Sequence, residues 1–181
     1  MLSKITFLAV LICGGPLPCL ADEKPKTKPA ELKVLKGYVG TWDAVIEVWP
    51  QGPNSPSIKF KGVETIRAFG EHWIASDFDS TFMGKTTTVH SILGYDLDKK
   101  QLVGTIIDHG PYKATMTGVH DAKSNTVSLT TRGRTADGKP GVQRTKITQK
   151  NPNERVLILL TPGKKKNEFT TMMKIKFVKR K

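Results

Sequence analysis

The feature that most constrains the fold is an alternation of apolar and polar residues with a period of two, which recurs from Thr41 onward. In the first run, Trp42 and Ile46 fall on one face and Asp43 falls on the other, which is the pattern of a half-buried strand. Nine similar runs follow, rich in threonine, valine, isoleucine and aromatic residues, at 57–68, 73–82, 86–95, 101–109, 112–120, 126–134, 142–149, 154–161 and 168–178. The sequence therefore predicts ten strands.

The links between these runs are short and carry turn-forming residues, for example at 50–54, 121–125, 136–139 and 151–153. Parallel strands need crossovers of about a dozen residues or more, so the sheet should be an antiparallel up-and-down meander. An all-β barrel is the most natural closure of such a sheet, because it leaves no unpaired edge. A sandwich of two sheets is the alternative.

One short helix is expected ahead of the strands. Residues 30–36 combine good helix formers with apolar residues at helical spacing, and Gly37 stands where a C-terminal cap belongs. Such a helix is long enough to plug one end of a barrel. We therefore expect 31–181 to form one β-barrel domain, since roughly 160 residues are enough for one domain and few for two.

The N-terminal segment has the layout of a secretory signal. Lys4 precedes an apolar run at 5–13, and cleavage after Ala21 fits the preference for small residues at that site. The run is too short for a membrane-spanning helix, which needs about 20 apolar residues, so no transmembrane segment is expected in the mature chain. We expect a signal peptide at 1–21, a disordered tether at 22–30, and export to the periplasm or the extracellular space.

Composition limits the partners of the exported domain. Both cysteines, Cys13 and Cys19, lie in the segment expected to be removed, which leaves no disulfide and no thiol nucleophile. The net charge of the whole chain is +13, and loss of Lys4 lowers it to +12, which favours an anionic polymer or membrane surface, or serves solubility alone. Specific nucleic-acid binding is not expected, because the basic clusters at 164–166 and 179–181 are not interleaved with aromatic residues.

An ordered set of motifs resembles one bacterial family. Gly40-Thr41-Trp42 looks like the Gly-x-Trp opening of lipocalins and fatty-acid-binding proteins. The pattern as a whole, over 32–179, resembles the family called domain of unknown function 1579, through Leu93-Gly94-Tyr95-Asp96, Gly104-Thr105 before Asp108, Gly118, Asp137-Gly138-Lys139 and a basic end after Phe177. The resemblance implies a lipocalin-like barrel without an established activity. Family members often carry tryptophan where this chain has Ile106, which implies an altered cavity if that position faces inward.

The resemblance also implies how the barrel closes. In lipocalins the opening tryptophan packs beneath a basic residue from the far end of the chain, in a cation–π contact. Here Trp42 would meet Lys179 or Arg180. Such a contact contributes about 0.5–2 kcal/mol, and arginine stacks better than lysine.

Glu64 is the first candidate for binding a ligand. If the alternation runs unbroken through Gly62, this carboxylate lies among apolar side chains and must be protonated, paired with a base, or available to a polar ligand group. A β-bulge at Gly62 would instead turn Glu64 to water. Trp42, His90 and Asp108 complete the set of candidate ligand-binding residues.

Motifs of known catalytic or metal chemistry are missing from the sequence. It contains no Gly-x-Ser-x-Gly elbow, phosphate loop or His-Glu-x-x-His motif. The four histidines, His72, His90, His109 and His120, fall in separate hairpins or strands, and none is near the C-terminus, where the related nitrobindin barrel binds haem. Asp77 and Asp79 share the face opposite Phe78, which predicts that they are solvated. We expect no catalytic residues, no metal and no cofactor.

Three functions fit these observations. The first is a non-enzymatic exported protein that binds a small, partly apolar molecule inside the barrel. The second is a basic envelope protein with a filled interior that binds anionic surfaces or polymers through its exterior. The third is an enzyme whose site is assembled from residues distant in sequence.

The signal peptide is directly testable. The intact mass of the protein secreted by its own host should correspond to a chain that begins at Asp22. A mass that retains residues 1–21 would contradict cleavage.

Overall fold

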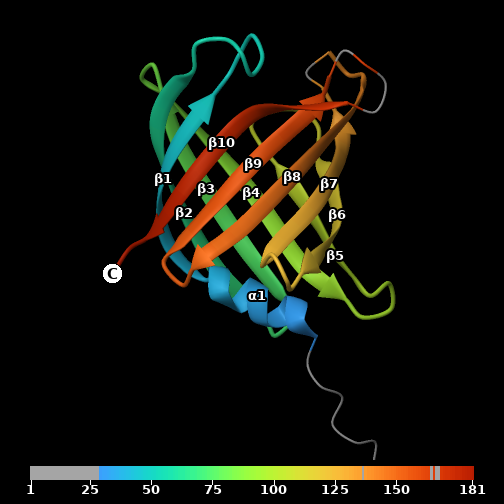
Figure 1. Cartoon of the computed structure of the whole chain (residues 1–181). Coiled ribbons are helices and arrows are strands. Elements are labelled where there is room, and N and C mark those ends of the chain that lie inside the picture. The colour runs from blue at the N-terminus through green and yellow to red at the C-terminus, as the bar shows by residue number, and fades with distance from the viewer. Residues whose placement is uncertain (1–28, 136, 164, 166–167) are drawn as a thin grey trace, which may run out of the picture.

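Ten antiparallel strands close into a barrel in the part of the chain that the computed structural model describes, and the helix α1 (Ala30–Tyr38) lies across one end (Figure 1). The described residues are 29–135, 137–163, 165 and 168–181. The expected signal peptide at 1–21 and nearly all of the expected tether at 22–30 lie outside them.

The strands follow one another around the ring in chain order. They are β1 (Gly40–Val48), β2 (Ile58–Phe69), β3 (Trp73–Phe82), β4 (Lys85–Asp96), β5 (Gln101–Ile107), β6 (Ala114–Asp121), β7 (Thr126–Arg134), β8 (Pro140–Asn151), β9 (Glu154–Pro162) and β10 (Phe169–Lys179). The first and last strands pair and close the ring, with Trp42 opposite Lys179. The predicted ten-stranded up-and-down barrel is confirmed, and the two-sheet sandwich is excluded.

The link between β5 and β6 is longer than predicted. The runs at 101–109 and 112–120 were each expected to include residues that the structure places in this link. The Asp108 side chain accounts for the early end of β5, because its Oδ1 accepts a hydrogen bond from the Gly110 N–H at 2.7 Å and so stabilises a local turn.

The helix α1 ends two residues later than predicted, at Tyr38 and not at Lys36. It continues through Gly37, the expected cap, and ends at Tyr38, after which the Val39 N–H donates to the Lys36 carbonyl oxygen at 3.2 Å. The left-handed backbone conformation occurs instead at Gly40, with φ of 130°. This glycine turns the chain from the helix directly into β1.

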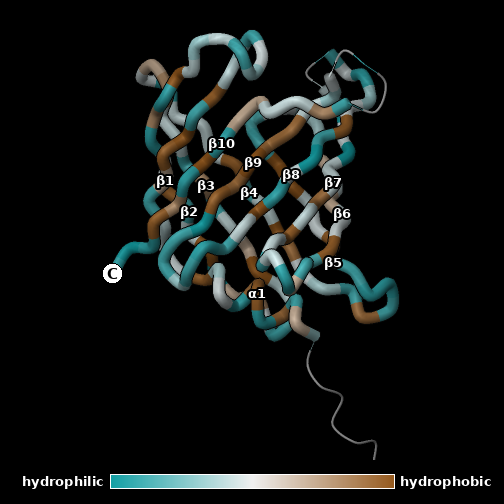
Figure 2. Tube along the Cα trace, in the orientation of Figure 1, coloured by the Kyte–Doolittle hydropathy of each residue, from teal (hydrophilic) through white to brown (hydrophobic). Residues whose placement is uncertain are grey.

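The packed core occupies the end of the barrel next to α1. Its fully buried side chains include Trp42, Leu102 and Val127, which lie near the starts of β1, β5 and β7. From the helix, Leu35 and Tyr38 are each 2% exposed and belong to the same apolar cluster. Figure 2 shows the alternation of apolar and polar residues along the strands that produces this inner face.

Close packing at this end requires a glycine at position 118. A Cβ atom on Gly118 would lie 2.0 Å from the Ser128 carbonyl oxygen on β7, a distance at which atoms must shift. In Gly118→Ala we therefore expect the free energy of unfolding to fall by about 1–3 kcal/mol, measured by chemical denaturation.

Gly37→Ala is the matched control for this substitution. Nothing lies within 4 Å of a Cβ atom built on Gly37. Alanine is the better helix former, so this variant should be more stable by about 0.5–1 kcal/mol. Equal effects of the two substitutions would show that backbone approach at Gly118 does not limit packing.

The buried Tyr38 side chain should make the free energy of unfolding of the barrel fall with rising pH in the alkaline range. Its hydroxyl is buried and has no hydrogen-bond partner among the described residues. Burial raises the pKa of Tyr38 from 10.0 to about 12. Between these values the folded protein keeps a proton that the unfolded chain has lost, so the stability contributed by this group is complete below pH 10 and is lost as pH rises to about 12.

Tyr38→Phe tests this assignment. Across that pH range the wild-type protein should lose about 2–3 kcal/mol more unfolding free energy than Tyr38→Phe. The variant should be at least as stable as the wild type at neutral pH, because it removes a buried hydroxyl without a partner. Tyr112→Phe, at an exposed tyrosine, is the control for the substitution itself. If the free energy of unfolding fell equally with pH in the wild type and in Tyr38→Phe, the assignment of this loss to Tyr38 would be wrong.

Candidate ligand-binding site

The barrel encloses a cavity of about 900 Å³ above its packed core. All ten strands contribute to its wall, together with Tyr38 from α1. Most of the lining side chains are apolar, such as Phe60, Phe78, Leu159 and Met173. The volume falls within the range of small-molecule pockets, about 300–1,000 Å³.

The cavity extends from the helix end of the barrel to the opposite end. At that end the lining residues include Asp108, His109 and Tyr112 from the β5–β6 link and Thr135 from the β7–β8 link. The site therefore has a floor closed by α1 and a mouth formed by two links.

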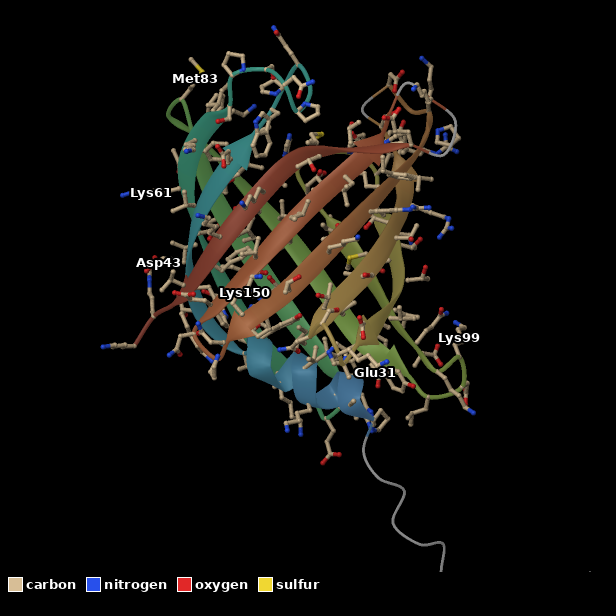
Figure 3. The ribbon with its side chains drawn as sticks, in the orientation of Figure 1. Glu31, Asp43, Lys61, Met83, Lys99 and Lys150 are labelled. Carbon is tan, nitrogen blue, oxygen red and sulfur yellow. The ribbon has the colours of Figure 1, made fainter. Side chains whose placement is uncertain are left out.

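Glu64 points into this cavity from β2. Gly62 pairs with Ala44 on β1 and with Ser80 on β3 without a shift of register, so the expected alternative of a bulge at Gly62 does not occur. Lys61, on the other face of the strand, projects away from the barrel (Figure 3). The unbroken alternation leaves the Glu64 side chain 16% exposed, among the apolar residues of the wall.

A base from a strand that is not paired with β2 neutralises Glu64. Arg155 Nη2 on β9 donates to Glu64 Oε2, and Ser76 Oγ on β3 donates to Glu64 Oε1 at 2.5 Å. The Arg155 side chain is only 3% exposed. Because β1 and β10 lie between β2 and β9 in the ring, this ion pair links strands that share no backbone hydrogen bonds.

Three aromatic rings surround the buried guanidinium. Arg155 Cζ lies 4.4 Å from the ring centroids of both Trp42 and Phe177, and 5.0 Å from that of Tyr38. All three distances are within the roughly 6 Å range of cation–π contacts. Burial lowers the pKa of Arg155 and the Glu64 carboxylate opposes this shift, so the guanidinium stays charged.

Trp42 joins the barrel floor to the helix. Its indole Nε1 donates to the Tyr38 carbonyl oxygen at 2.7 Å, and the ring is completely buried. Lys179 Nζ lies 5.3 Å from the Trp42 ring centroid. Arg180 instead turns outward and donates to Asp43 Oδ1 from Nε at 2.9 Å and from Nη2 at 2.6 Å, with Asp43 on the outside of the barrel (Figure 3).

His90 lies on the outer surface, away from Glu64 and the cavity. Its Nδ1 is 2.7 Å from Asp77 Oδ1, and Arg67 Nη2 is 2.5 Å from the other oxygen of the same carboxylate. Hydrogen bonding to His90 is the main cause that lowers the pKa of Asp77. Asp79, also outside, accepts a hydrogen bond from Thr88 Oγ1 at 2.6 Å. The two aspartates therefore take part in surface interactions, on the face where they were predicted.

Asp108 and Ile106 do line the cavity. Asp108 lies at the mouth of the cavity, and its carboxylate accepts the hydrogen bond from the Gly110 N–H. Ile106 forms part of the wall. The structure thus brings Trp42 and Glu64 into one cluster, and places Asp108 at the opposite end of the cavity.

Arg155 was not identified from the sequence. The signal that identifies it is its position in the alternation of β9, where it shares the inward face with Leu157 and Leu159. A charged residue on an apolar face needs a buried partner, and Glu64, on the inner face of β2, is a charged residue of the opposite sign. Matching these two positions would have predicted the pair.

The described residues contain no group of three or more His, Cys, Asp or Glu side chains placed to hold a metal ion. Within the same residues, no helix has the length and apolar character needed to cross a membrane.

Solved structures share this fold at low sequence identity. The crystal structure of Rv2717c from M. tuberculosis is similar with a TM-score of 0.64 and 8% identity, over 84% of this chain and 99% of that one. An S-type phycobiliprotein lyase, CPES from Guillardia theta, is similar with a TM-score of 0.57 and 10% identity, over 85% of this chain and 94% of that one. At these identities the likeness concerns the fold.

Among curated proteins, none matches the chain. A family described as "Protein of unknown function (DUF1579)" matches residues 27–179, which include the helix, all ten described strands and the buried Glu64–Arg155 pair. The match covers most of the chain and confirms the family that the sequence motifs resemble. The chain therefore belongs to the DUF1579 family, and its described residues fold as a closed antiparallel β-barrel.

Proposed function

We propose that this protein binds one small, largely apolar molecule inside its barrel. The observation that carries the proposal is the cavity of about 900 Å³, with predominantly apolar walls and a polar cluster at its closed end. Apolar walls supply affinity through the hydrophobic effect, and a few placed polar groups supply orientation.

Binding is favoured over catalysis by the state of the polar groups at the floor. The Glu64 carboxylate is engaged on both oxygens, by Arg155 and by Ser76. A general base has to be within reach of a substrate proton, and this carboxylate is already occupied by the protein's own donors. An enzyme with a dispersed site is therefore the weaker reading.

The proposal includes export, for which the secretory layout of residues 1–21 is the support. An exported carrier would meet its ligand in the envelope or outside the cell. The fold likeness to a phycobiliprotein lyase is compatible with handling a small molecule, but the cavity of this chain carries the argument.

The test is native mass spectrometry of the protein purified from its own host, followed by solvent extraction. We expect one small-molecule adduct per chain, released by the organic solvent. An empty barrel that binds anionic vesicles in a salt-sensitive manner would instead support a function of the basic exterior.

A matched pair of variants assigns the adduct to the cavity. Thr131 lines the cavity from β7, whereas the adjacent Thr130 is not among the lining residues. Thr131→Trp should reduce the adduct about tenfold by filling the space, equivalent to about 1.4 kcal/mol of binding free energy, and Thr130→Trp should retain it. Equal retention by both variants would place the adduct outside the barrel.

A further inference from the structure

We propose that the floor of the cavity selects an uncharged, oxygen-bearing head group, such as an alcohol, ketone or amide, and disfavours a carboxylate. This inference rests on the proposed binding function and narrows its ligand class. The inference is based on two buried polar atoms, one on Arg155 and one on Tyr38, that have no hydrogen-bond partner among the described residues.

The first unused atom is Arg155 Nε. The side chain is 97% buried and lines the cavity, yet its Nε has no hydrogen-bond partner among the described residues. The second is the buried Tyr38 hydroxyl oxygen, which also lacks a partner within the described chain, on a residue that lines the same cavity. Buried polar atoms in native proteins are nearly always paired, so two in one place indicate a missing binding partner.

The two residues belong to one cluster. The guanidinium carbon of Arg155 lies 5.0 Å from the Tyr38 ring centroid, at the end of the cavity closed by α1. Arg155 Nε is a donor only, and the Tyr38 hydroxyl can donate because burial raises its pKa to about 12. An oxygen atom with two lone pairs can accept from both groups at once.

Charge decides which oxygen compound fits. Glu64 and Arg155 neutralise each other inside the barrel, and Ser76 adds no charge. A carboxylate ligand would add an uncompensated negative charge beside Glu64 in a buried site, which is strongly unfavourable. An ammonium group would meet only donors at Arg155. A neutral oxygen satisfies both unused atoms without changing the net charge of the floor.

The experiment is a displacement assay with Nile red, an uncharged apolar dye, on the full mature protein at pH 8. The competitors are 1-decanol, decanamide and decanoate, which share one chain length and differ in the head group. We expect decanol and decanamide to displace the dye at concentrations at least about tenfold lower than decanoate. Equal or stronger displacement by decanoate would overturn the head-group inference, while dye binding itself would still support the proposed function.

Two variants test the roles of the floor residues. Tyr38→Phe removes one donor and should weaken decanol and decanamide about threefold to tenfold, each measured against the affinity of the same variant for Nile red. Glu64→Gln leaves Arg155 without its counter-charge and should reverse the preference, so that decanoate becomes the strongest competitor. If Glu64→Gln does not fold, the head-group inference is decided by whether Tyr38→Phe weakens displacement by decanol and decanamide.

The control variant is Tyr95→Phe, because Tyr95 is partly buried against the core and is not among the residues that line the cavity. It should keep the wild-type order of competitors. If Tyr38→Phe left the displacement by each of the three competitors at its wild-type value, a water molecule alone would satisfy the unused atoms and the head-group inference would be overturned. A failure of Nile red to bind the wild type would count against the proposed function and this inference together.

Discussion

Burial of the Arg155 charge is the constraint on which the closed end of the barrel depends. A guanidinium that is 3% exposed is tolerable only with a counter-charge and polarisable surroundings. Glu64 supplies the charge from across the interior, and Trp42, Phe177 and Tyr38 supply the aromatic faces. Each half of the ion pair makes the other necessary, since either one alone would leave an isolated ion inside the barrel. The hydrogen bond from Trp42 to the Tyr38 carbonyl then ties this cluster to the helix.

The same cluster separates two kinds of interior. Toward α1, large apolar side chains such as Leu35 and Leu102 are packed without exposure to water. On the other side of Arg155 and Glu64, the inward-facing residues of the strands enclose space. A ligand that enters from the mouth would therefore meet apolar walls first and the polar floor last, so the floor would orient the bound molecule along the axis of the barrel.

The architecture could be predicted from sequence because it depends on local patterns. Period-two alternation and short links determine an antiparallel barrel, and the observed strands differ from the predicted ones mainly at their ends. Asp108 shows why ends are difficult: a single side-chain hydrogen bond to the Gly110 N–H helps to stop β5 early. Gly37 shows a related limit, because packing of Tyr38 into the core extends the helix past a residue that local preference marks as its end.

The site was less predictable because its key contacts join residues far apart in sequence. The prediction that Trp42 meets a base from the end of the chain drew attention to Lys179 and Arg180, and Lys179 does lie over the ring. The more buried base, Arg155, comes from β9 and reaches a carboxylate 91 residues away in sequence. Similarly, nothing local distinguishes a bulge at Gly62 from a regular strand. The regular pairing of β2 with both of its neighbours is what turns Glu64 inward.

Closure of the ring by its first and last strands also governs how the domain can come into existence. Arg180 contacts Asp43 across 137 residues of sequence, and β1 has no second neighbour until β10 is in place. Such distant pairing tends to make folding slow, because a large loop must close before the contacts compensate for its entropy. A nascent chain in which β10 has not yet been synthesised has unpaired edges on β1 and β9. Unpaired strand edges are the elements most prone to pair with other chains. Synthesis of β10 therefore determines whether the strands made before it close into a barrel or stay exposed to aggregation and proteolysis.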